Sequence, residues 1–252
     1  MYKVPGESGP LVIQCFHEFQ VFKNNQLISF KTAKVKELFA YLFTYKNTYI
    51  HRDLLIENLW PEQEYKKAKI NLHTCISHLR KLFSQLGYES IISFSNQCYC
   101  LILEDFDCDA STFYQIASNS GKVDNSNIKL IEEAIYLYSG GYCEMNGYKW
   151  ANESYLEYHQ LMTSLLRRAI DYIKDVDLTK ALSYSQQFLK LNPYSDEVVN
   201  QMMDLHISMG NYSNAIKVFQ DYRQLLNDEL GIEPNNILTD VFDKLKLSHH
   251  RS

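Results

Sequence analysis

Hydrophobic and polar positions divide residues 66–86 into two sides of one long helix. Apolar residues recur there at steps of three and four, the spacing at which side chains share a helix face. The apolar side consists of Leu72, Ile76, Leu79 and Phe83, with Cys75, Leu82 and Leu86 beside them. The opposite side carries Lys67, Asn71, Thr74, His78 and Lys81, flanked by Lys66, Lys69, His73, Ser77 and Arg80. A charged row of this kind is usually only the solvated face of a helix, so its meaning depends on the neighbouring elements.

The residues before this helix predict a small antiparallel sheet and two shorter helices. Apolar runs at 11–16, 19–22 and 27–30 read as strands, with Asn24 and Asn25 at a hairpin turn. Thr32 is placed to cap the first helix, in which apolar residues recur at helical spacing up to position 42. The second helix is expected over 52–60, because Pro61 ends it.

A second hairpin is predicted after the long helix. The β-rich runs 91–95 and 99–103 flank Asn96 and Gln97, which would form its turn. The order of sheet, three helices and hairpin is typical of a winged helix-turn-helix, in which the third helix enters the major groove of DNA and the hairpin forms a wing.

From residue 109 onward the pattern is purely helical and it repeats. Helices are expected at 109–118, 126–139, 150–174, 177–191, 195–209, 211–230 and 236–247. Residues 34 apart correspond in type, for example Ala181 with Ala215 and Phe188 with Tyr222. A 34-residue period of paired helices is the signature of tetratricopeptide repeats, which build surfaces for proteins or peptides. The predicted fold class is therefore an α+β winged helix-turn-helix domain followed by an all-α tetratricopeptide-like repeat domain.

The charge of the chain is unevenly distributed. The net charge of -5 hides a balance of +2 over residues 1–105 and -7 over residues 106–252. A mildly basic first half with a basic helix suits contact with a polyanion, whereas the acidic second half does not. No signal-peptide pattern and no apolar run long enough for a membrane span occurs in the sequence. A cytoplasmic protein without membrane contact is expected.

Other chemistry-bearing groups have ordinary interpretations. The acidic run Glu104–Asp109 is compatible with a metal or acid–base site, but a solvated boundary between domains is favoured. His249 and His250 are interpreted as a frayed tail rather than a metal site. Cys98 and Cys100 would point to the same side of a strand, either bridged or as free thiols, with free thiols favoured in a reducing cytoplasm. No catalytic residue, metal site or cofactor site is predicted, because phosphate-loop, zinc and hydrolase motifs are missing from the sequence.

The chain resembles the SARP-type bacterial transcriptional regulators, in which an OmpR/PhoB-like winged helix precedes a bacterial transcriptional activator domain. The segments that carry the resemblance are Trp60-Pro61, Leu72–Leu82, Cys98–Leu101, Asp109–Phe113, Tyr138–Gly141, Trp150-Ala151, Ala181-Leu182, Leu191–Pro193 and Glu229–Pro234. The implied organisation is a lead-in at 1–10, a DNA-binding domain at 11–105, an activator domain at 106–247 and a tail at 248–252. Ten residues before Leu11 cannot hold a receiver domain, so activation through an attached receiver is not expected if these residues are the whole natural chain.

The resemblance and the helix pattern together predict a DNA interface. Asn71, Thr74 and His78 are expected at base edges, and Lys66, Lys67, Arg80 and Lys81 at phosphates. The alternative to a DNA contact is, for Arg80, a salt bridge within the domain. For His73 the alternative to a DNA contact is half-buried packing. Asn96 and Gln97 at the wing tip would touch the minor groove or only form the turn. The family usually has Arg at position 78 and Gly at position 98, so the details of recognition are expected to differ here.

The expected function is sequence-specific binding of promoter double-stranded DNA by a transcriptional activator. Its helical domain would form a homodimer or contact RNA polymerase or a regulatory protein. The alternative is a protein-interaction adaptor whose winged helix no longer binds DNA, which the overall acidity and His78 leave open.

Overall fold

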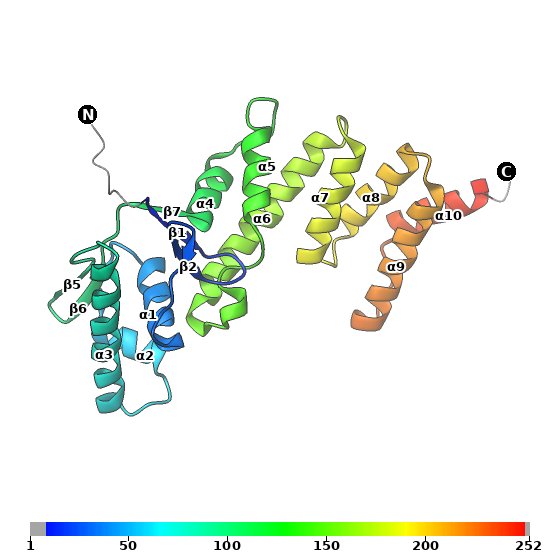
Figure 1. Cartoon of the computed structure of the whole chain (residues 1–252). Coiled ribbons are helices and arrows are strands. Elements are labelled where there is room, and N and C mark those ends of the chain that lie inside the picture. Colours follow the sequence, from blue (N-terminus) through cyan, green and yellow to red (C-terminus); the bar gives the residue numbers. More distant parts are fainter. Residues whose placement is uncertain (1–8, 250–252) are drawn as a thin grey trace. The chain divides into compact units, whose positions relative to one another are not determined.

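The computed structural model describes residues 9–249 (Figure 1). Most of the predicted lead-in and the end of the predicted tail lie outside these residues. The described chain forms two packing units. Unit 1 comprises residues 9–113 and Leu137–Tyr158, and unit 2 comprises Tyr114–Tyr136 and residues 159–249.

Unit 1 begins with a four-stranded sheet of order β3-β2-β1-β7. The first three strands are β1 (Leu11–Gln14), β2 (Gln20–Lys23) and β3 (Gln26–Leu27). Asn24 and Asn25 both adopt positive φ, 52° and 61°, in the β2–β3 turn, which confirms the predicted hairpin. The fourth strand, β7 (Phe106–Cys108), pairs in parallel with β1 and was not predicted from the sequence.

Three helices follow the first hairpin. They are α1 (Ala33–Thr44), α2 (Arg52–Leu59) and α3 (Tyr65–Gln85), and the Thr32 hydroxyl caps α1 by accepting from the Val35 N–H. Buried aromatic rings join α1 to α3, with the centroids of Phe39 and Phe83 4.6 Å apart. The buried residues of α3 are Ala68, Leu72, Cys75, Ile76, Leu79 and Phe83, so the predicted apolar side of this helix is confirmed.

The wing is the hairpin of β5 (Ile92–Ser95) and β6 (Cys98–Leu101). The short strand β4 (Ile50–His51) pairs with β6 and completes a sheet of order β4-β6-β5. All six cysteines carry free thiols, Cys98 and Cys100 included.

Helices make up the rest of the described chain. They are α4 (Asp109–Asn119), α5 (Ile128–Leu137), α6 (Asn152–Ile173), α7 (Leu178–Leu191), α8 (Asp196–Ser208), α9 (Tyr212–Leu230) and α10 (Asn236–His249), with 3-10 turns at Glu144–Asn146 and Lys149–Ala151. The 34-residue offset relates the pair α6–α7 to the pair α8–α9, and Ala181 and Ala215 are both fully buried. The sequence thus predicted the α+β region and the helical region correctly. Within residues 9–249 we find no helix whose length and apolar character would suit a bilayer crossing.

One carboxylate holds the start of α4 to the first sheet of unit 1. Asp109 accepts hydrogen bonds from the backbone N–H groups of Cys15 (2.8 Å), Phe16 (3.1 Å) and Ala110 (2.6 Å). The acidic run at 104–109 is therefore more than a solvated boundary. Its middle forms the strand β7, and its last residue, Asp109, is half-buried.

Candidate nucleic-acid interface

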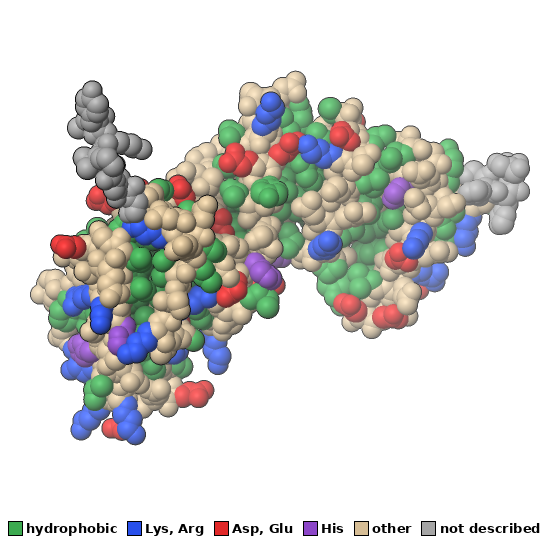
Figure 2. All heavy atoms as spheres, viewed as in Figure 1, with side chains coloured by type: hydrophobic (Ala, Val, Ile, Leu, Met, Phe, Trp, Pro, Cys, Tyr) green, Lys and Arg blue, Asp and Glu red, His purple; other side chains and the backbone are tan. Residues whose placement is uncertain are grey.

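The solvent-exposed side of α3 is a basic stripe. Its exposed residues after Tyr65 are Lys66, Lys67, Ile70, His73, Thr74, Ser77, Arg80, Lys81, Ser84 and Gln85. Lys and Arg side chains gather over the part of the molecule that α3 occupies (Figures 1 and 2). Asn71 and His78 are only half-buried rather than exposed, so they lie at the edge of this stripe. Its centre runs through Ile70 and Ser77, a position displaced from the row that the sequence indicated.

Two of the three predicted base-reading side chains donate hydrogen bonds within the protein. The Asn71 amide donates to Oε1 of Gln63 at 2.8 Å, and the Thr74 hydroxyl donates to the carbonyl of Ile70 at 2.9 Å. His78 lines a hollow beside the start of α1 that also contains Lys31. A base contact by Asn71 would therefore require its bond to Gln63 to be exchanged.

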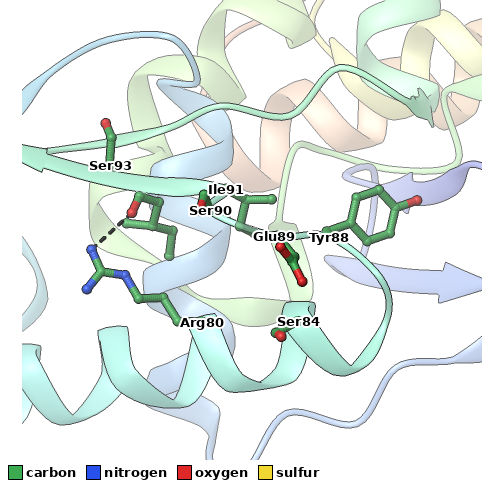
Figure 3. A pocket seen from close by; sticks show the side chains of 8 residues that line it. Arg80, Ser84, Tyr88, Glu89, Ser90, Ile91 and Ser93 are labelled. Carbon is green, nitrogen blue, oxygen red and sulfur yellow. Dashed lines mark hydrogen bonds between the residues drawn. The ribbon is translucent and has the colours of Figure 1, made fainter.

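The four predicted phosphate ligands differ in whether the side chain is hydrogen-bonded within the protein. Lys66, Lys67 and Lys81 are exposed. Arg80 points across a hollow toward β5, where its guanidinium donates to the carbonyl of Ile92 at 3.0 Å (Figure 3). The partner is a backbone carbonyl rather than the carboxylate of a salt bridge. The contact fixes one end of the guanidinium beside the wing.

The wing tip is tied to the starts of α2 and α3. Asn96 and Gln97 adopt positive φ, 48° and 62°, as the predicted turn requires. The Arg52 guanidinium donates to Oε1 of Gln97 at 2.8 Å and to the hydroxyl of Tyr65 at 3.2 Å. Tyr65 in turn donates to Asp53 at 2.6 Å, a bond that lowers the pKa of the Asp53 carboxyl. These contacts set the wing tip relative to the first turn of α3.

Two residues of this surface, Arg52 and Ile70, were not singled out as candidate contacts by the sequence. Arg52 opens α2, and only the folded chain brings it to the wing tip. Ile70 had a detectable signal, because it is an apolar residue that falls outside the register of the buried face of α3. His73 is exposed, and its Nδ1 lies 3.2 Å from the hydroxyl of Tyr99 in the wing, so packing alone does not describe it.

One group of potential metal ligands lies away from α3. Sγ of Cys15, Sγ of Cys108 and a carboxylate oxygen of Asp109 lie within 4.8 Å of one another. The Asp109 oxygens are already occupied by three backbone N–H donors, and burial raises the pKa of the Cys15 thiol. The two thiol sulfurs are in contact at 3.7 Å. These bonds give the cluster a structural role in joining β1 to β7 and α4.

Two described protein families match the chain. Residues 108–246 match the family described as bacterial transcriptional activator domain. Residues 26–101 match the one described as transcriptional regulatory protein, C terminal. The two segments cover most of the sequence in the order that was predicted.

The similar proteins are named as regulators. The transcriptional regulatory protein MoaR1 of Mycobacterium tuberculosis is 22% identical over 227 residues, which cover 85% of this chain and 72% of that protein. The transcriptional regulatory protein EmbR of Mycobacterium bovis is 21% identical over 225 residues, covering 85% and 58%. The regulatory protein AfsR of Streptomyces griseus is 20% identical over 248 residues, covering 96% and 25%. The chain thus spans less than two thirds of EmbR and a quarter of AfsR.

A solved structure shares the fold. Mycobacterium tuberculosis EmbR in complex with a low affinity phosphopeptide has a TM-score of 0.70 to this chain at 18% sequence identity. The match covers 96% of this chain and 66% of that chain.

Proposed function

The chain belongs to the bacterial transcriptional activator domain family, with the arrangement of the SARP-type transcriptional regulators, and on this premise we propose that it binds promoter double-stranded DNA as a sequence-specific activator. In this proposal α3 lies in the major groove and the β5–β6 wing lies against the adjacent minor groove. The observation that carries the proposal is the exposed basic stripe of α3, with the wing tip held beside it by Arg52.

Each predicted contact residue receives a role in the proposal. Lys66, Lys67, Arg80 and Lys81 bind phosphates, which position the helix without reading sequence. Asn71, Thr74 and His78 meet base edges from one side of the stripe. Asn96 and Gln97 approach the minor groove at the wing tip. The acidity of residues 106–252 restricts DNA contact to the first half of the chain.

The helical region is proposed to form a homodimer or to contact RNA polymerase or a regulatory protein. Exposed apolar side chains on unit 2 support an interaction surface there, among them Tyr136 (87% exposed) and Val176 (71%). Selection of bound sequences from random duplex DNA distinguishes the arrangements of a pair of subunits. An inverted repeat implies a two-fold dimer, and a direct repeat implies a head-to-tail pair.

A salt titration tests the DNA contact directly. The Lys67→Ala/Lys81→Ala double variant removes two proposed phosphate contacts, so the slope of log affinity against log salt should become about two units less steep. Between 50 and 200 mM salt its affinity would then fall by a factor about tenfold smaller than that of the wild type. The variant should also bind more weakly to every duplex sequence, because phosphate contacts carry no sequence information.

Fluorescence anisotropy with a labelled duplex from the selection measures both quantities. The matched control is Lys190→Ala/Lys217→Ala, which removes two exposed lysines of unit 2 and should leave the slope unchanged. Equal slopes for the α3 variant and the wild type would refute DNA binding through α3. If the wild type bound no duplex at all, the adaptor function would replace the proposal.

A further inference from the structure

Ile70 occupies the centre of the basic stripe although it is apolar. Its side chain is 65% exposed. It lies one turn after Lys66 and Lys67 and one turn before Thr74, all of which are exposed. A single exposed isoleucine is ordinary on a protein surface. Here, however, it projects from the middle of the face that carries the proposed phosphate ligands, where the bases of a bound duplex would lie.

The polar side chains next to Ile70 are engaged within the protein. The Thr74 hydroxyl gives its proton to the carbonyl of Ile70 itself, and the Asn71 amide donates to Gln63. His73 is in contact with the Tyr99 hydroxyl. These groups have less capacity to donate to bases than their residue types suggest. Of the two residues at the centre of the stripe, Ser77 offers only a small hydroxyl, whereas Ile70 presents a large aliphatic side chain that needs no hydrogen-bond partner.

We propose that Ile70 is a specificity-determining residue that recognises the C5-methyl group of thymine in the major groove. This inference rests on the proposed DNA-binding function. Thymine alone among the four bases presents a methyl group in the major groove, and an apolar side chain recognises it by van der Waals contact and removal of water. Thr74 contributes its methyl group to the same apolar surface, because its hydroxyl is turned to the helix backbone.

The expected effect is modest and specific. Burying one methyl group against an aliphatic side chain is worth a factor of about four in affinity. The contact involves no charge, so it should leave the salt dependence of binding unchanged. These two properties separate the role of Ile70 from that of the lysines.

Deoxyuridine tests the contact, because it differs from thymidine only by the methyl group. A duplex carrying the sequence selected by the wild type is compared with duplexes in which single thymines are replaced by deoxyuridine. The wild type should lose affinity about fourfold at one or more positions. Ile70→Ala should bind both duplexes equally and keep the salt slope of the wild type. Ile70→Val, which retains a branched apolar side chain, should keep the discrimination in part.

The matched control is Ile102→Ala, which truncates another exposed isoleucine of unit 1 (42% exposed) outside α3 and should retain the fourfold preference. Circular dichroism should show the same helix content for Ile70→Ala and the wild type, since the removed atoms face solvent. Discrimination that persists in Ile70→Ala, or that is missing in the wild type, would overturn the proposal while DNA binding stands. A wild type that binds no duplex would overturn both.

Discussion

Replacing Asp109 by alanine is expected to destabilise unit 1 by about 3 kcal/mol. The carboxylate accepts from three backbone N–H groups, those of Cys15 and Phe16 after β1 and that of Ala110 in α4. Alanine leaves all three donors without this acceptor. A buried donor without a partner costs about 1–3 kcal/mol, and water reaching this partly buried position restores some of the loss, which favours the lower value for each bond.

Tryptophan fluorescence makes unit 1 separately observable. The chain has two tryptophans, Trp60 and Trp150, and both belong to unit 1. With a urea dependence of about 2 kcal/mol per molar, the expected destabilisation lowers the midpoint by about 1.5 M. Asp107→Ala is the matched control, because it removes an exposed carboxylate from the neighbouring strand β7 and should leave the midpoint unchanged.

The effect should depend on pH. Burial raises the pKa of the Asp109 carboxyl, and the backbone N–H groups offset that rise only in part. The folded unit therefore keeps a proton that the unfolded chain releases near pH 4. The resulting stabilisation is complete below that pH and is lost as the pH rises through the folded-state pKa. Asp109→Ala should thus lose more stability at pH 4 than at pH 7.5. The expected shift of the urea midpoint is about 1.5 M. A shift below about 0.3 M at both pH values would therefore refute the anchoring role of Asp109.

Two further substitutions probe unit 1. Gly141→Ala would place a Cβ 2.0 Å from Cε2 of Tyr155, so the ring must move at a cost of about 1–3 kcal/mol. Its urea midpoint by tryptophan fluorescence should fall, whereas Gly121→Ala, which meets no atom within 4 Å, should leave that midpoint unchanged. Arg52→Ala removes the side-chain bonds to Gln97 and Tyr65 and should weaken binding to the selected duplex about threefold in anisotropy titrations. An unchanged affinity would show that the side-chain bonds of Arg52 are not needed, since its backbone N–H still donates to the Gln97 carbonyl at 2.8 Å in the variant.

Local pattern was sufficient to predict most of the secondary structure. Each predicted helix after residue 108 begins and ends within two residues of its observed bounds, because capping residues and breakers such as Asn192-Pro193 mark the ends. The strands β4 and β7 were missed for a physical reason. They contain two and three residues, too few for a period, and they exist through pairing with residues distant in the chain.

The candidate interface was harder to predict than the fold. The sequence predicted that α3 and its lysines form the DNA interface. A helical wheel, however, treats every residue of the polar side as equally exposed. Packing against the rest of unit 1 determines that Asn71 and His78 are half-buried while Ile70 is exposed. The contact of Arg52 with Gln97 joins positions 45 residues apart, which periodicity cannot detect.

The parallel pairing of β1 with β7 bears on how such chains can be recombined. The family matches end at residue 101 and begin again at residue 108, which makes the short stretch between them an obvious crossover point for chimeras of related regulators. A chimera joined there would build one sheet from two parents, with β1 from the first and β7 and Asp109 from the second. Unit 1 would be inherited whole only if residues 106–113 and Leu137–Tyr158 came from the same parent as the wing.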